Sequence, residues 1–168
     1  MKKPLDEARK YKELNQYAEK SQVVVFGDNY LFGFPYYDLM QGRVTDYAVY
    51  NRSIPNMTLE EAVPAAEYCL YHLSPKAVLL CFEKEGNEKN FRENYLQLIR
   101  IIRSFDKKCS IGIIDRGEKS DETLENIAKV SRCDHLHIPA EWDYQKAFHT
   151  MDAFFRGGKI SFWDAFSL

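Results

Sequence analysis

The sequence lacks several features that mark common functional classes. Its 23 Lys and Arg are matched by 25 Asp and Glu, so a net charge of −2 leaves no cationic excess for a nucleic-acid backbone. No apolar run is long enough to span a bilayer. The charged segment after Met1 has no apolar centre of the kind found in a signal peptide. We therefore expect a cytoplasmic protein that has neither nucleic acid nor a membrane as a partner.

Nucleotide and metal motifs are also missing. There is no P-loop and no Gly-x-Gly-x-x-Gly, which argues against nucleoside triphosphates and dinucleotides, and we expect no cofactor. The four cysteines are widely spaced without a Cys-x-x-Cys pair, which favours reduced core thiols. His135 and His137 would share one face of a strand, but two histidines at this spacing are a weak metal signal. We expect ordinary half-buried histidines and no metal.

The sequence does contain a regular alternation of helices and strands. Its 168 residues, with an ordinary 45% apolar content, suit a single domain over residues 1–168. Short apolar runs such as Val23–Phe26 are typical of strands buried on both faces of a parallel sheet. The predicted strands are 23–26, 45–50, 77–82, 109–114 and 134–138. The predicted helices are 5–20, 58–73, 90–105, 120–131 and 141–155. This order predicts a three-layer α/β/α sandwich with a five-stranded parallel sheet, flavodoxin-like in topology.

Local signals place some boundaries and the functional loops. Thr58 and Glu61 form a capping-box pattern at a helix start, and Pro64 predicts either a kink or a later start. Residues 30–43, with Pro35 near their middle, are predicted as a loop that has room for a short helix. Ligands of such sheets bind outside the carboxyl ends of the strands, so the loop that begins at Gly27 is the first candidate for the site.

That loop carries a family resemblance. The segment VVVFGDNYLFGFP follows the pattern Gly-Asp-Ser at the end of a first strand, and AVYNRSIPNMTLEEAV and SPKAVLLCFEKEGN resemble the next two blocks of the same family. Together they cover roughly residues 22–115, and the chain resembles the SGNH/GDSL hydrolases. In that family the serine attacks an ester carbonyl, backbone N–H groups and an asparagine form the oxyanion hole, and a late Asp-x-x-His supplies the base.

The catalytic positions depart from this pattern. The serine position holds Asn29, whose carboxamide is a very poor nucleophile, beside the loop-forming Asp28. The second block has Ser53 in place of glycine. The third block is out of register, with Asn87 as the nearest candidate for the oxyanion amide. Asp134 and His137 imitate the late pair, yet they fall on the predicted last strand.

We expect a degenerate, catalytically impaired relative that binds a small acyl, ester or glycan ligand, or a protein partner, in the former active-site cleft. One alternative is an active esterase rebuilt around Ser53 with Asp134 and His137. Another is a structural or interaction protein without a cleft. The aromatic tail at 154–168 is a candidate homodimer contact. The candidate ligand-binding residues are Gly27, Tyr30, Phe32, Arg52 and Arg116.

Overall fold

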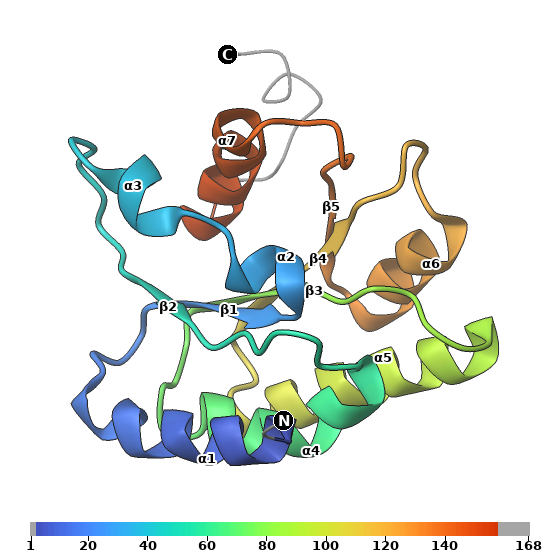
Figure 1. Cartoon of the computed structure of the whole chain (residues 1–168), viewed down its shortest axis with the longest axis horizontal. Helices are drawn as coiled ribbons and strands as arrows, with labels where there is room; N and C mark the ends of the chain where they lie inside the picture. Colours follow the sequence, from blue (N-terminus) through green and yellow to red (C-terminus); the bar gives the residue numbers. More distant parts are fainter. Residues whose placement is uncertain (1–2, 158–168) are drawn as a thin grey trace.

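The computed structural model describes residues 3–157, and its centre is a five-stranded parallel sheet in the order β2-β1-β3-β4-β5. Every neighbouring pair is parallel. Helices cover both faces (Figure 1), which confirms the predicted α/β/α sandwich. The strands are β1 (Val23–Gly27), β2 (Val49–Asn51), β3 (Ala77–Cys81), β4 (Ser110–Asp115) and β5 (Asp134–His137). The helices are α1 (Pro4–Leu14), α2 (Asn29–Phe32), α3 (Tyr36–Met40), α4 (Leu59–Leu70), α5 (Glu88–Phe105), α6 (Glu122–Ser131) and α7 (Tyr144–Phe155), and a 3-10 turn spans Asn15–Tyr17.

Two hydrophobic clusters hold the layers together. Alternate residues of β1 point to opposite faces, so Val24 and Phe26 join a cluster with α1, α4, α5 and α6, whereas Val23 and Val25 join a second cluster with α2, α3 and α7. Every residue of β1 and β3 is buried, as expected for central strands of a parallel sheet. The apolar runs in the sequence therefore correspond to the strands in the middle of the core.

Several boundaries differ from the sequence-based prediction. The first helix ends at Leu14, because the side chain of the buried Asn15 turns to donate to backbone oxygens of Cys69 and Tyr71 at the end of α4. The second strand is shorter and later than expected. Tyr47 packs against Phe155 and donates its hydroxyl hydrogen to Asp152, so this part of the chain joins the α7 layer before the strand begins.

The structure also settles the start of α4 and the conformation of residues 30–43, for which the sequence left alternatives. The capping box at Thr58 and Glu61 is present, and α4 runs from Leu59 with Pro64 inside it, so the proline does not delay the start. For residues 30–43 the sequence predicted a loop with room for a short helix, and the structure has two short helices in this region, α2 from Asn29 and α3 from Tyr36, on either side of Pro35. Among residues 3–157, no helix has the length and apolar character that a bilayer crossing requires.

Candidate functional site

The strand order places a topological switch point between β1 and β3, because the chain passes from β1 to β2 on one side and then crosses to β3 on the other side of β1. The backbone is very close there. A Cβ on Gly27 would lie 2.3 Å from the carbonyl oxygen of Cys81, so only glycine fits at this position. The next residue, Asp28, donates its N–H to the same oxygen at 3.2 Å. Gly27 therefore serves the close packing of the two strand ends.

Asp28 ties the loop after β1 to the loop after β3. Its carboxylate accepts a hydrogen bond from the N–H of Glu83 at 2.8 Å, and its backbone oxygen accepts one from Phe32 at 2.9 Å. The residue is only 6% exposed, and this burial raises the pKa of its carboxyl group. Asp28 thus has the loop-holding role that the family resemblance implies.

The side chain of Asn29 is hydrogen-bonded to another residue of the protein, Asn56. Its Nδ2 donates to Oδ1 of Asn56 at 3.1 Å, and the backbone N–H of Asn56 donates back to Oδ1 of Asn29 at 2.9 Å. Asn56 lies in the left-handed region with φ of 61°, a conformation that asparagine tolerates better than most residues. The side chain in the family's nucleophile position is therefore one half of a reciprocal amide pair.

Ser53 has partners of its own inside the protein. It is fully buried, and its Oγ accepts a hydrogen bond from the N–H of Gly27 at 3.0 Å. Its own N–H donates to Asn51, and its backbone oxygen accepts from Tyr11 at 2.8 Å. The hydroxyl oxygen of Ser53 thus fixes the end of β1 from inside the protein.

Arg52 and Asn87 also have structural partners. The charge of the Arg52 guanidinium lies over the ring of Tyr11 in α1, and its Nε donates to Asn15 at the start of the 3-10 turn at 2.9 Å. Asn87 caps α5, and its side-chain oxygen accepts from the N–H of Asn90 at 2.8 Å. Neither side chain is brought to Asn29 by these contacts.

The residues of the expected Asp-x-x-His pair are separated along β5. Asp134 begins the strand and His137 ends it, so at roughly 3.3 Å per residue their Cα atoms lie about 10 Å apart and their side chains face opposite ways. His137 contacts the backbone oxygen of Gly117 through its Nε2 at 2.7 Å. Because β2 and β5 are the two edges of the sheet, four strand spacings of about 4.8 Å also separate His137 from the loop of Ser53. The structure does not bring the proposed triad together.

A buried aspartate–histidine pair was missed by sequence reasoning. Asp115, at the end of β4, is 1% exposed, and its carboxylate contacts Nε2 of His135 at 3.0 Å. It also accepts from the N–H groups of Gly117 and Asp121. Burial acts to raise the pKa of Asp115, but these bonds outweigh burial and the pKa is lowered. The parallel register of β4 and β5 creates the pair, and no motif in the sequence announces it. Among residues 3–157, no group of three His, Cys, Asp or Glu side chains could hold a metal ion.

A cavity of about 340 Å³ opens at the switch point. Its walls come from the ends of β1, β3 and β4 and from the starts of α5 and α6. Two predicted site residues meet here: the guanidinium carbon of Arg116 lies 3.4 Å from the centre of the Tyr30 ring. Nη1 of Arg116 and the hydroxyl of Tyr30 are both buried without a hydrogen-bond partner. Burial also raises the pKa of Tyr30 to about 12, so its hydroxyl keeps its proton at neutral pH.

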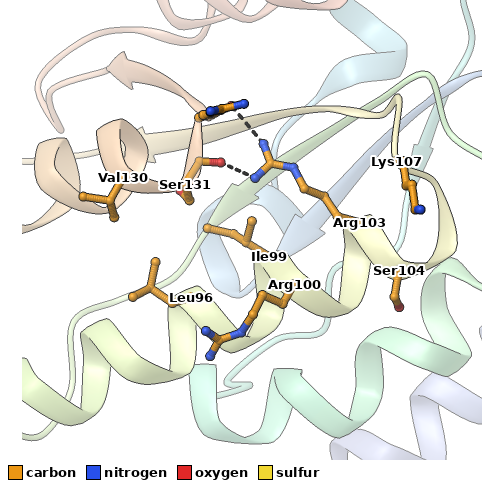
Figure 2. A pocket seen from close by; sticks show the side chains of 9 residues that line it. Leu96, Ile99, Arg100, Arg103, Ser104, Lys107, Val130 and Ser131 are labelled. Carbon is orange, nitrogen blue, oxygen red and sulfur yellow. Dashed lines mark hydrogen bonds between the residues drawn. The ribbon is translucent and has the colours of Figure 1, made fainter.

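Two other hollows flank the molecule. One, of about 410 Å³, lies on the other side of Asn29 and is lined by the exposed Phe32 with Tyr11, Ile54 and Asn56. The other, of about 650 Å³, lies between the ends of α5 and α6 and contains Arg100 and Arg103 (Figure 2). Arg103 donates to the backbone oxygens of Ser131 and Arg132 there. Helices that follow parallel strands end at the amino edge of the sheet, so this third hollow is remote from the switch point.

Solved structures share this fold. A lipase/acylhydrolase from Enterococcus faecalis has a TM-score of 0.64 over 84% of this chain and 100% of its own, at 15% sequence identity. A candidate acylhydrolase from Bacteroides fragilis gives 0.66 over 94% and 97%, at 12% identity. A GDSL-like lipase from Bacteroides thetaiotaomicron gives 0.61 over 80% and 78%, also at 12%. No protein-family profile and no curated protein matches the sequence. The chain therefore has the fold of the GDSL-like lipases and acylhydrolases, as the resemblance over residues 22–115 predicted.

Proposed function

We propose that this chain is a binding protein on a GDSL-hydrolase fold, which has lost serine-based ester hydrolysis and holds a small acyl, ester or glycan ligand at the carboxyl edge of its sheet. The observation that carries the proposal is the reciprocal pair of Asn29 and Asn56. Nucleophilic catalysis needs an activatable group in contact with a base. The carboxamide of Asn29 has no such group, and its side-chain oxygen and nitrogen already have partners.

The cavity beside Asn29 supports a binding role. The residues before and after Asn29, Asp28 and Tyr30, both line the 340 Å³ cavity at the switch point. This volume is at the lower end of the range of about 300–1,000 Å³ that is usual for small-molecule sites. A binding protein with this cavity is favoured over a purely structural protein, because the strand ends leave a hollow with polar groups unsatisfied.

The rebuilt-esterase alternative depends on contacts between Ser53 and a base. Ser53 is fully buried and follows one edge strand of the sheet, whereas His137 ends the opposite edge strand. No observation favours this arrangement, and the same assays separate it from the binding proposal.

The first test is ester turnover. We expect the wild type to hydrolyse p-nitrophenyl acetate and butyrate no faster than buffer without protein does, and Asn29→Ser to be no faster. Ser104→Ala, at an exposed position, is the control for Ser53→Ala. Turnover by the wild type that disappears in Ser53→Ala or His137→Ala would overturn the proposal. Turnover gained in Asn29→Ser, with none in the wild type, would show that a base still reaches position 29. It would overturn the second expectation but would support recent decay of a complete site through loss of the serine.

The second test is binding. Butyrate, methyl butyrate and mannotriose are added separately while backbone amide resonances are followed by NMR. We expect at least one probe to shift the resonances of Asp28, Tyr30 and Arg116 without shifting those of Arg100, which lies in the remote groove. Shifts confined to the remote groove, or none with any probe, would overturn the binding proposal.

A further inference from the structure

Arg116 differs from the other guanidinium groups of the fold in having a buried nitrogen without an acceptor. Arg52 donates to Asn15, Arg103 to backbone oxygens, and Arg156 to Asp152. Within residues 3–157, no carboxylate lies within ion-pair distance of Arg116, and its Nη1 is buried without a hydrogen-bond partner. A buried donor without a partner destabilises the fold, and a charged one does so more strongly. Such a group in a cavity wall calls for an acceptor from outside the chain.

The hydroxyl of Tyr30 has the same need and lies beside it. The two side chains are stacked, with the guanidinium 3.4 Å from the ring centre, so both donors belong to one end of the cavity. The hydroxyl is protonated at neutral pH. One acceptor group with two oxygens could take a hydrogen bond from each donor.

Apart from the exposed Glu83, the other charged side chains of the cavity already have partners. Lys84 is paired with Glu88 and Asp121 at 2.7 and 3.3 Å. Asp28 accepts from the N–H of Glu83, and Asp115 accepts from two N–H groups and contacts His135. These carboxylates turn their oxygens to the protein but still make the surroundings negative. A dianion such as phosphate would be repelled, whereas a single negative charge can be balanced by Arg116.

The remaining wall is apolar. Phe82 and Phe91 are nearly buried, and Ile114 and Leu124 complete this part of the cavity. These side chains would cover a hydrocarbon body and exclude water from it. A planar carboxylate is also the group that pairs best with a planar guanidinium.

We infer that the cavity binds a small organic carboxylate, a short-chain or aromatic acid, with its carboxylate on Arg116 and the Tyr30 hydroxyl and its apolar body against Phe82 and Phe91. This inference rests on the proposed binding function and names the class of ligand. It adds an anchor, Arg116, that belongs to β4 and its loop, away from the position of Asn29.

The test compares acids with their uncharged amides. Benzoate, butyrate, benzamide and butyramide are titrated at neutral pH by calorimetry, with NMR to locate each binding site. We expect the acids to bind about ten-fold or more tightly than the amides, because a hydrogen bond to a charged group contributes roughly 1.5–3 kcal/mol. Arg116→Gln should remove this preference, and Tyr30→Phe should weaken acid binding about ten-fold, because its hydroxyl donates to a charged carboxylate.

Two controls keep the result interpretable. Arg100→Gln makes the same charge change in the remote groove, and it should bind acids like the wild type. Arg116→Lys keeps the charge without the planar fork, and it should retain part of the preference. Thermal unfolding of each variant establishes that it is folded, and if Arg116→Gln is unfolded, Arg116→Lys and Tyr30→Phe carry the test.

The outcomes separate this inference from the proposed function. If acids and amides bind the cavity equally well, or Arg116→Gln leaves acid affinity unchanged, the carboxylate anchor is wrong while a binding function stands. If inorganic phosphate binds as tightly as benzoate, the site is a general anion site and the inference fails. If neither acids nor amides bind, the inference fails, and mannotriose and methyl butyrate decide the wider proposal.

Discussion

The two sides of the carboxyl edge of the sheet differ in whether their polar groups have hydrogen-bond partners. On the side of β2, Asn29 and Asn56 are hydrogen-bonded to each other, and Ser53 accepts from the backbone N–H of Gly27. On the side of β4, Tyr30 and Arg116 keep a buried hydroxyl and a buried guanidinium nitrogen without partners. Satisfied polar groups stabilise the fold, whereas unsatisfied buried donors cost stability, and those in a cavity wall are free to bind a ligand. The position that matches a nucleophile is thus on the structural side.

The largest expected effect comes from Gly27, where the two sides meet. In Gly27→Ala the new methyl group would lie 2.3 Å from the Cys81 oxygen, and backbone must move to relieve the contact. We expect a loss of about 3 kcal/mol in the free energy of unfolding, measured by urea denaturation. Gly33→Ala, whose Cβ meets Asn29 only at 3.4 Å, is the matched control and should change stability little. Equal stability of the two variants would contradict the close packing of β1 and β3.

The next largest effect is expected at Ser53, on the β2 side, where the polar groups have hydrogen-bond partners. Ser53→Ala removes the oxygen that accepts from the N–H of Gly27 and leaves this buried donor unpaired. We expect a loss of about 2 kcal/mol by urea denaturation. Ser104→Ala, at an exposed position on α5, should lie within about 0.5 kcal/mol of the wild type. If Ser53→Ala left the free energy of unfolding unchanged, the structural role assigned to Ser53 would be wrong and Ser53 would again be a candidate nucleophile.

The two buried aspartates should titrate on opposite sides of their ordinary pKa of 3.8. Burial raises the pKa of Asp28, whereas N–H donors and His135 outweigh burial and lower that of Asp115. Asp28 therefore contributes stability that is present below pH 3.8 and lost as the pH rises through its raised pKa. Asp115 contributes stability that is present above 3.8 and lost as the pH falls through its lowered pKa.

Carboxyl carbon NMR measures both titrations directly. Urea denaturation of Asp28→Asn and Asp115→Asn over the same pH range measures their consequences. Relative to Asp28→Asn, the wild type should become less stable as the pH rises above 3.8, and relative to Asp115→Asn, less stable as the pH falls below it. Titration of the two groups in the reverse order would contradict the hydrogen bonds assigned to them.

The smallest effect is expected at Tyr30, on the β4 side, where the buried donors have no hydrogen-bond partner. Tyr30→Phe removes a buried hydroxyl that has no partner, so we expect the unliganded protein to keep its stability or to gain up to about 1 kcal/mol. Thermal unfolding measures the change, with Ser53→Ala as the contrasting deletion of a hydroxyl that has a partner. A loss of about 2 kcal/mol or more would mean that the Tyr30 hydroxyl has a hydrogen-bond partner inside the protein. The hydroxyl would then not be available to bind a carboxylate.

Local patterns predicted the frame of the molecule but few of the contacts at its site. The run Val23–Phe26 predicted a buried strand, and Thr58 with Glu61 predicted a helix start, because each signal depends on neighbours in the sequence. Asn87 and Arg52 were expected at the site from their place in the motifs, yet each has a nearer structural partner. The cap at Asn87 is a local contact with Asn90 that the sequence could have indicated. The contact of Arg52 with Asn15 joins distant parts of the chain, and one sequence does not contain that information.

The sequence by itself determined the α/β alternation, the parallel sheet and the absence of a serine at position 29, since periodicity and residue identity are local properties. Only the tertiary structure decided which polar groups meet. It paired Asn29 with Asn56 and Asp115 with His135, separated Asp134 and His137 along one strand, and stacked Arg116 on Tyr30. The physical reason is that hydrogen bonds and desolvation act over a few ångströms in space, between residues that strand order and register bring together from distant parts of the chain.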